Sequence, residues 1–201
     1  MVRPPLYLRR LYPGVTWNYP SPEKVLYLTF DDGPIPEVTP QVLSILKGYN
    51  AQATFFCIGE NVVKHPEIYQ QVQSAGHRIG NHTYHHYNSW KVRYRDFIKD
   101  VEKAQHLIQS DLFRPPYGKL TARTLFSLRK QYRIIMWDVI SCDFDTKVPK
   151  EEVLQNVLTH AENGSIIVFH DSIKASKNML YALPIVLKHF SDKGYVFKQI
   201  D

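Results

Sequence analysis

The segment VLYLTFDDGP, residues 25–34, joins a run of β-branched and aromatic residues to two adjacent carboxylates and a Gly-Pro pair. The run at 25–30 is typical of a buried β-strand. Asp31 and Asp32 stand directly after it, and the glycine and proline that follow favour a turn. The segment therefore predicts a strand that presents two carboxylates at its carboxyl end.

Strand-like and helix-like segments alternate along the rest of the chain. The predicted strands are residues 25–30, 53–58, 77–80, 112–113, 133–137, 165–169 and 195–200. The predicted helices are residues 39–49, 60–75, 96–108, 121–131, 151–161 and 181–190. This alternation favours an α/β fold with about seven parallel strands and crossover helices. We expect a single domain over residues 23–201, with the proline-rich residues 1–22 as an arm packed on it.

Candidate functional residues follow five of the predicted strands. In chain order they are Asp31 and Asp32, His82 and His86, Arg114 and Tyr117, Asp138 and Asp143, and His170 and Asp171. In a parallel barrel the carboxyl ends of the strands share one rim, where active sites are built. An open doubly wound sheet would also gather residues at strand ends, and it is the structural alternative.

The histidines and carboxylates have the composition of a metal site. His82 and His86 are four residues apart, and neutral imidazole is a preferred ligand of Zn, Co, Ni and Fe. Each piece alone is ambiguous, because Asp-Asp-Gly-Pro can be a simple turn and a histidine pair can be accidental. Two histidines and one carboxylate, however, supply three ligands and leave positions open for water and substrate. A second carboxylate, an arginine and a distant histidine then suit a base, its partner and an acid.

On these residues the chain resembles the NodB-type polysaccharide deacetylases, carbohydrate esterase family four. The family signature Thr-Phe-Asp-Asp-Gly-Pro stands unchanged at 29–34, His-Ser/Thr-x-x-His at 82–86 and Arg-x-Pro-Phe/Tyr at 114–117. Asp-x-x-Asp-Trp is matched only in part at 141–144, and Leu-x-His is matched by 168–170. The resemblance covers nearly the whole chain from about residue 25. It implies an irregular (β/α) barrel of about seven parallel strands, the NodB-homology deacetylase fold.

The resemblance implies a metal site and a base. Asp32, His82 and His86 would hold one divalent metal ion, with Zn²⁺ as the first choice and Co²⁺ or Ni²⁺ as alternatives. Asp31 would be the general base. Arg114 would pair with it and keep it ionised, because a nearby positive charge favours a carboxylate.

The resemblance also implies an acid, an oxyanion site and substrate contacts. His170 would be the general acid, oriented and kept protonated by Asp143. The backbone N–H of Tyr117 would stabilise the oxyanion. The residues expected to contact substrate are Pro116, Tyr117, Phe144 and Val168. Phe144 replaces the family's tryptophan and Val168 its leucine. His85 stands where a small residue is common and is a candidate for a spare ligand or for a hydrogen-bond donor behind the ligands.

The implied activity is a metal-dependent hydrolase that removes N-acetyl groups from N-acetylglucosamine in peptidoglycan or chitin-like glycans. O-acetyl xylan is the second substrate in the same class. A metal-dependent hydrolase of a small non-sugar amide and a non-catalytic carbohydrate-binding protein are the rivals from other classes. The intact acid, base and arginine argue against the non-catalytic reading.

The composition and charge of the chain limit the classes of partner that we expect. With 201 residues, 44% of them hydrophobic, the chain is long enough for a sizeable core. The net charge of +6 is scattered and no nucleic-acid motif accompanies it, so we expect no nucleic-acid partner. No apolar run approaches the roughly 18 residues that span a bilayer, and we see no signal peptide in residues 1–11. A disulfide between Cys57 and Cys142 is possible but unsupported, and oligomeric state is left open.

Overall fold

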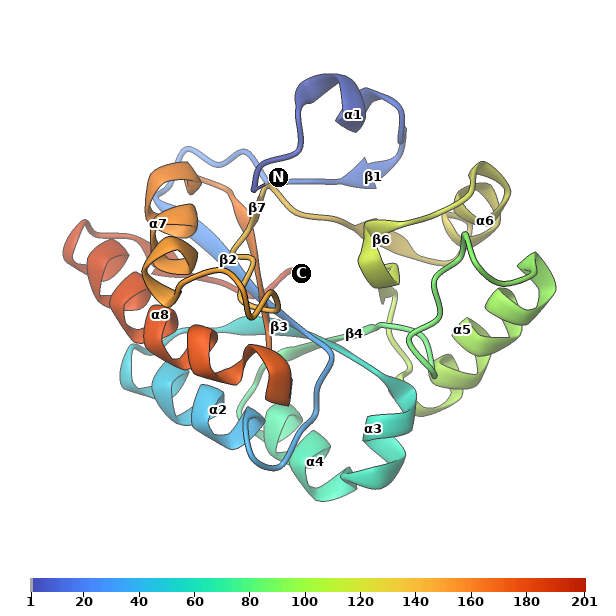
Figure 1. The fold of residues 1–201 in the computed structure, drawn as a ribbon, viewed down its shortest axis with the longest axis horizontal. Coiled ribbons are helices and arrows are strands. Elements are labelled where there is room, and N and C mark those ends of the chain that lie inside the picture. The colour runs from blue at the N-terminus through green and yellow to red at the C-terminus, as the bar shows by residue number, and fades with distance from the viewer. Residues whose placement is uncertain (1) are drawn as a thin grey trace.

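The computed structural model describes residues 2–201, and its strands form a parallel sheet that curves into an incompletely closed barrel (Figure 1). The strands are β1 (Val15–Thr16), β2 (Val25–Asp31), β3 (Ala53–Cys57), β4 (Arg78–Asn81), β5 (Leu112–Phe113), β6 (Arg133–Ile135), β7 (Val139–Ile140), β8 (Ile166–His170) and β9 (Val196–Phe197). Their order is β1-β6-β5-β4-β3-β2-β8-β7, with β9 beside β2, and every pairing between them is parallel. The predicted fold class is confirmed, and β1 and β7 are additions to the seven expected strands.

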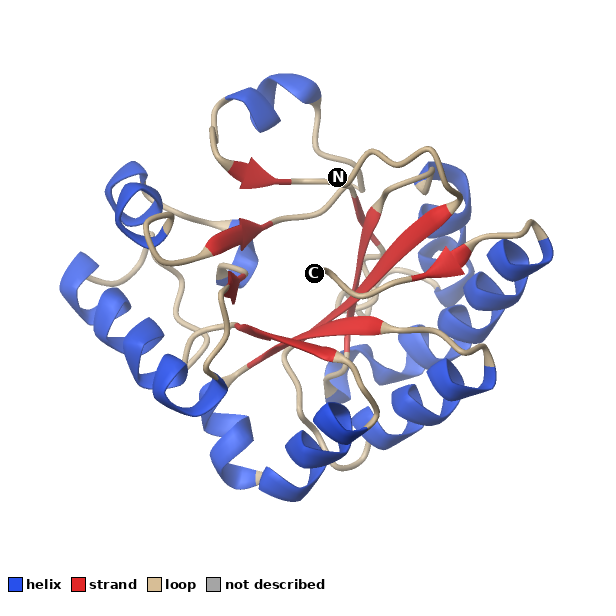
Figure 2. Ribbon diagram, turned by 180° about the vertical axis from the view of Figure 1, so that it is seen from behind, coloured by secondary structure: helices blue, strands red, loops and turns tan. Residues whose placement is uncertain are grey.

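Helices cover the outside of the sheet (Figure 2). They are α1 (Leu6–Arg10), α2 (Thr39–Gly48), α3 (Gly59–Lys64), α4 (Pro66–Ser74), α5 (Tyr94–Ile108), α6 (Ala122–Leu128), α7 (Lys150–His160) and α8 (Ile173–Asp192). Among residues 2–201, no helix is both long and apolar enough to cross a membrane.

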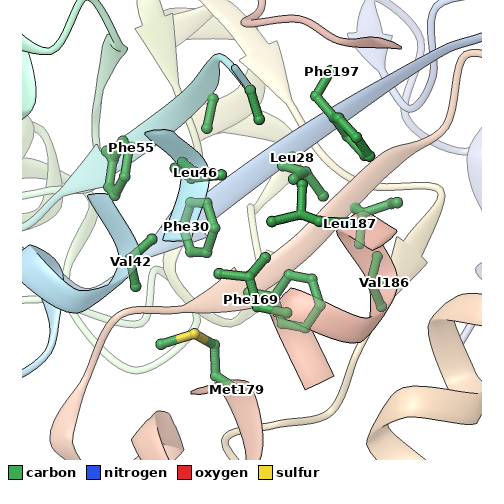
Figure 3. Packing of buried hydrophobic residues seen from close by; sticks show 14 of the residues in the cluster. Leu28, Phe30, Val42, Leu46, Phe55, Phe169, Met179, Val186, Leu187 and Phe197 are labelled. Carbon is green, nitrogen blue, oxygen red and sulfur yellow. The ribbon is translucent and has the colours of Figure 1, made fainter. Parts of the chain in front are cut away.

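The period-two alternation of β2 separates the outer core from the barrel interior. Phe30 faces the helices and stacks between Phe55 and Phe169, with ring centroids 5.0 and 6.1 Å apart (Figure 3). Burial of each such ring contributes roughly 1.5–3 kcal/mol. Thr29 and Asp31 therefore point to the opposite side of the strand, into the barrel.

The amino-terminal end of the barrel interior is filled by a small apolar cluster, formed by Phe56, Leu112, Ile135, Ile166 and Ile200. Ile200 comes from the C-terminal segment, where its backbone N–H donates to Thr54 Oγ1 at 2.9 Å. Because this end is packed shut, polar groups inside the barrel are open to solvent only at the carboxyl ends of the strands.

The barrel is interrupted between β6 and β7, which are consecutive in the chain but do not pair. The N-terminal segment lies across this interruption. Strand β1 pairs with β6, Asn18 forms an antiparallel bridge to Ser165, and the Ile140 N–H donates to Val2 O at 3.0 Å. The segment thus contacts the sheet on both sides of the gap.

The structure corrects the predicted position of Asp138. Strand β6 ends at Ile135 rather than at residue 137, so Asp138 precedes β7 instead of ending a strand. It lies at the amino-terminal end, where its carboxylate accepts hydrogen bonds from Ser165 Oγ and pairs with Arg3 and Arg9 of the N-terminal segment.

Two predicted helices also differ from those observed. The helix expected at 60–75 is interrupted at His65, because Pro66 lacks an N–H and begins a second helix at its first position. The helix expected at 181–190 begins at Ile173, eight residues earlier. Both cysteines are free thiols, with Cys57 buried in β3.

Candidate active site

A cavity of about 670 Å³ opens at the carboxyl ends of the strands. Seven of the residues predicted to function line it: Asp31, Asp32, His82, His86, Tyr117, Phe144 and His170. Arg114 and Asp143 are fully buried behind its wall. Residues from the ends of five separate strands therefore meet in one place, as the rim of a parallel barrel requires.

Asp32, His82 and His86 form the metal-ligand group. One ligand atom from each lies within 4.8 Å of the others. The Nε2 atoms of His82 and His86 are 3.7 and 3.3 Å from Asp32 Oδ1. This Oδ1 is buried and has no hydrogen-bond partner among the described residues, which would be costly for a carboxylate that stayed alone. Two imidazoles and an unpartnered carboxylate oxygen fit a divalent transition metal such as zinc.

His82 is held in the tautomer that a metal ligand needs. Its Nδ1 lies 2.7 Å from the backbone oxygen of Arg114, so Nδ1 carries the proton and Nε2 keeps its lone pair. Burial lowers the pKa of His82 to about 4, which keeps the ring neutral at physiological pH. The arginine thus positions a ligand through its main chain.

Arg114 also holds Asp31 through its side chain. Its Nη1 donates to Asp31 Oδ1 at 2.7 Å and to Thr29 Oγ1 at 2.7 Å, while Nε and Nη2 donate to the carbonyls of Ile135 and Met136. Burial disfavours the Asp31 carboxylate, but the Arg114 guanidinium, together with His82 and His170, outweighs burial and lowers the pKa of Asp31. Asp31 is therefore ionised and faces the cavity.

His170, the register partner of Asp31 on the neighbouring strand β8, is paired with Asp143. Asp143 accepts from the His170 backbone N–H and lies 2.8 Å from its Nδ1. Burial opposes the charged imidazole, but Asp143 and the carboxylates of Asp32 and Asp31 together outweigh burial and raise the pKa of His170 to about 9. Phe144 stands edge-on to the ring at a centroid distance of 5.0 Å, which restrains its orientation.

A buried carboxylate shapes the turn after β2. Asp171 accepts from Gly33 N–H at 3.0 Å and from Thr39 Oγ1 at 2.6 Å. A Cβ on Gly33 would lie 2.0 Å from the Asp171 carboxylate, so only glycine fits. This turn holds the backbone of Asp32 at φ 81°, and the Asp32 carboxylate lies next to His82 and His86. Asp171 was among the candidates from the sequence, and the structure places it outside the cavity lining, in support of this turn.

The segment that carries the histidines is fixed by Asp100 of α5. This buried carboxylate accepts from the backbone N–H groups of Tyr84 and His85 at 2.9 and 3.0 Å and pairs with the His85 ring. His85 is therefore directed away from the metal-ligand group and is not a ligand. Asp100 was not among the functional residues predicted from the sequence. Its signal is a carboxylate within the apolar stripe of Phe97, Val101 and Ala104.

The remaining wall combines predicted and unpredicted residues. Tyr117 has a left-handed backbone (φ 61°), and its ring lies tilted against that of His86 at a centroid distance of 4.7 Å. Trp137, which the sequence analysis did not select, lines the cavity, as does Pro115. Pro116 and Val168, both expected to contact substrate, are buried and absent from the lining. Val168 pairs with Thr29 in register, one layer below His170.

Comparison with known proteins identifies the family. The family model described as polysaccharide deacetylase matches residues 18–133. A peptidoglycan-N-acetylglucosamine deacetylase of Bacillus cereus is 36% identical over 191 residues, covering 91% of this chain and 89% of that protein. A chitooligosaccharide deacetylase of Azorhizobium caulinodans is 37% identical over 155 residues, covering 73% of each.

The fold agrees with this relationship. A crystal structure of a peptidoglycan N-acetylglucosamine deacetylase, in complex with a naphthyl N-hydroxybenzamide, superposes with a TM-score of 0.86 at 33% sequence identity, covering 98% of this chain and 95% of that one. The chain thus belongs to the polysaccharide deacetylase family, the NodB-type members of carbohydrate esterase family four.

Proposed function

We propose that the chain is a metal-dependent deacetylase that hydrolyses the acetamide of N-acetylglucosamine in a glycan, releasing acetate and a free amine. The observation that carries this proposal is the convergence of three groups on one cavity. They are the ligand group of Asp32, His82 and His86, the ionised carboxylate of Asp31, and the imidazolium of His170. Cleavage of an amide needs an activated water, a stabilised oxyanion and a proton for the leaving nitrogen.

A metal held by Asp32, His82 and His86 would supply Lewis acidity, which acidifies water and polarises the amide carbonyl. Zinc suits this donor set, and Co²⁺ or Ni²⁺ are alternatives. Each ligand is held by the protein beforehand, His82 by the Arg114 carbonyl and the backbone of the His86 segment by Asp100.

The protein's own groups would carry the protons. Asp31, ionised by Arg114, takes a proton from the attacking water. The backbone N–H of Tyr117, which lines the cavity, donates to the oxygen on which negative charge develops. His170, kept protonated by Asp143, gives its proton to the sugar nitrogen as the C–N bond breaks, because an amide anion is too poor a leaving group to depart alone.

Substrate contacts would come from the exposed cavity wall. Phe144 and Tyr117 remain candidates for contact with the acetyl group and the sugar. Trp137 and Pro115 join them as lining residues. The relatives support a glycan substrate, since their names describe deacetylation of peptidoglycan and of chitooligosaccharide.

Acetate release from N-acetylglucosamine oligomers tests the proposal. The protein is stripped of metal and reloaded with Zn²⁺ or Co²⁺, with Asp31→Asn as the catalytic control. We expect release that needs the metal and is lost in the variant. Stoichiometric metal without release would contradict the N-acetyl activity, and assays on O-acetylated xylan and on small aryl acetamides would then separate the two alternative hydrolases.

A further inference from the structure

A second hollow of about 450 Å³ lies beside the catalytic cavity. The two share Lys174, which lines both. Four of the nine residues that line the second hollow are lysines, and we call Lys147, Lys150, Lys174 and Lys177 the lysine groove. The groove is therefore a lateral continuation of the site where the acetylated sugar would lie.

Two segments build the lysine groove. Residues 146–151 lead into α7, and the first turns of α8 supply Lys174 and Lys177, which are three residues apart and so share one side of the helix. Ala175 and Met179 of the same helix are buried in the core. Asn178 Nδ2 donates to the backbone oxygen of Val148 at 3.1 Å, which fixes the loop against the helix.

The positive charge of the groove is mostly uncompensated. Lys150 lies 3.9 Å from Glu151 and over the Tyr181 ring at 4.4 Å. Lys147, Lys174 and Lys177 make no ion pair within residues 2–201, although Asp145 accepts from the Lys147 backbone N–H at 3.0 Å. A net balance of about three positive charges therefore faces solvent next to the cavity.

Another basic hollow on the molecule differs from the lysine groove both in its relation to the catalytic cavity and in the pairing of its charges. It is lined by residues of α5 and α6, including Arg93 and Arg123, and it shares no lining residue with the catalytic cavity. Arg93 is already paired with Asp96 at 2.7 Å. Of these two basic hollows among residues 2–201, the lysine groove is the one that combines unpaired positive charge with a residue shared with the catalytic cavity.

We propose that the lysine groove binds carboxylates carried by an anionic glycan while its acetylated sugar occupies the catalytic cavity. This inference rests on the proposed deacetylase function and names its substrate class. A glycan with carboxylate-bearing lactyl or peptide side chains, as in peptidoglycan, presents negative charges on the sugar adjacent to the one deacetylated. A chitin-like oligomer has none and would leave the lysines without partners. Ion pairs at this groove therefore favour the anionic glycan.

The test compares two substrates of equal sugar length, a neutral N-acetylglucosamine tetramer and a peptidoglycan fragment that retains its peptide carboxylates. The variant is Lys147→Gln/Lys177→Gln. We expect the kcat/KM ratio of anionic to neutral substrate to fall about five- to tenfold, the size of two solvent-exposed ion pairs, mainly through KM. Added salt should bring the ratio of the unmodified protein toward that of the variant.

The matched control is Lys47→Gln/Lys193→Gln, which removes the same charge at the carboxyl ends of α2 and α8, on the opposite end of the barrel. This control should leave the ratio within about twofold, because exposed charges beyond a Debye length are screened. A similar loss in both double variants would overturn the proposal, since it would reveal a general effect of net charge. Equal losses on both substrates would overturn it as well.

Direct binding separates this proposal from the catalytic one. Calorimetry of the metal-loaded Asp31→Asn protein with the anionic fragment needs no turnover. Salt-sensitive binding that weakens about five- to tenfold when Lys147→Gln/Lys177→Gln is added supports the groove even if no acetate is released. Binding that the added pair leaves unchanged overturns it, whatever the activity assays find.

Discussion

Each end of the barrel contains a buried aspartate that is paired with arginine, but the two aspartates differ in how many of their carboxylate oxygens accept hydrogen bonds. At the amino-terminal end, Asp138 has both oxygens occupied, Oδ1 by Arg3 and Arg9 and Oδ2 by Ser165 Oγ at 2.5 Å. At the carboxyl end, Asp31 Oδ1 binds Arg114, while Oδ2 accepts no hydrogen bond from any residue in 2–201.

This difference separates a structural carboxylate from a reactive one. Asp138 is fully buried and joins the N-terminal segment to β7 and β8, so its hydrogen-bonding capacity is used within the protein. Asp31 is also buried beside an arginine, but it lines a cavity with one oxygen free. Burial and an arginine are common to both, and the free oxygen facing a cavity is what makes Asp31 a candidate base.

The same chemical change at both ends tests this contrast most strongly. Asp31→Asn should lower kcat for deacetylation by about 10²–10⁴-fold, since it removes a general base. It should still bind stoichiometric metal, because Asp32 and the two histidines are intact. Acetate release and metal content are measured on the same sample. Turnover by Asp31→Asn at the unmodified rate would refute its role as base.

Loss of Asp100 should weaken metal binding at the carboxyl end of the barrel without changing any of the three ligand residues. Asp100→Ala frees the backbone of the histidine segment, and we expect metal affinity to fall about 10–100-fold, as for other groups that orient ligands. Competition with a chromogenic chelator measures this affinity. Asp96→Ala on the same helix is the control and should change it little. Unchanged affinity in Asp100→Ala would mean that the segment is held by other contacts.

Asp138→Asn should affect stability rather than catalysis. The substitution weakens two ion pairs whose arginines reach solvent, so we expect a cost of about 1–2 kcal/mol in unfolding free energy. Urea denaturation measures it, and kcat per folded molecule should stay within about twofold. A large loss of kcat with unchanged stability would erase the distinction between the two ends.

The smallest effect that we expect is a change in the pH dependence of activity. If His170 donates its proton, activity should decline as pH rises through its pKa of about 9. Asp143→Asn removes the main cause that raises this pKa, so the decline should move at least about one unit lower. Rate–pH profiles of both proteins provide the comparison, and superimposable alkaline limbs would exclude His170 as the titrating acid.

The same ion pair links His170 to stability. Its pKa in the folded protein lies above the usual value of 6.5, so its contribution is fully present below about pH 6.5 and is lost as pH rises through about 9.

The central strands and the candidate site residues were predictable because both depend on local pattern. Alternation along 25–31 fixes which side chains face inward, and the metal ligands stand within a few residues of strand ends. The family resemblance supplied the roles. Arg114 and Asp143 lie against Asp31 and His170, as the resemblance implied.

The misplaced and missed residues depend on contacts between distant segments. Asp138 was expected at the carboxyl end of a strand because the predicted strand, 133–137, extends two residues beyond the observed strand β6. Asp100 lies within the apolar stripe of its helix, but the backbone groups that it binds belong to the histidine segment, and this contact forms only when the two segments pack together. The helix expected at 181–190 begins earlier, at Ile173, because Ala175, Met179 and Ala182 continue its buried stripe against the core.

The contact of the N-terminal segment with both sides of the barrel gap has a consequence for binding entropy. Free sheet edges normally fray, yet here β6 and β7 are both joined to the same segment, through β1 and through Val2. Trp137, between β6 and β7, and Ile140, in β7, form part of the cavity wall. If the chain binds a glycan as proposed, the width of the cleft would be set before the glycan binds, and less conformational freedom would be lost on binding. The N-terminal segment, none of whose residues is among those that line the cavity, would then contribute to substrate affinity by preorganising the cavity walls.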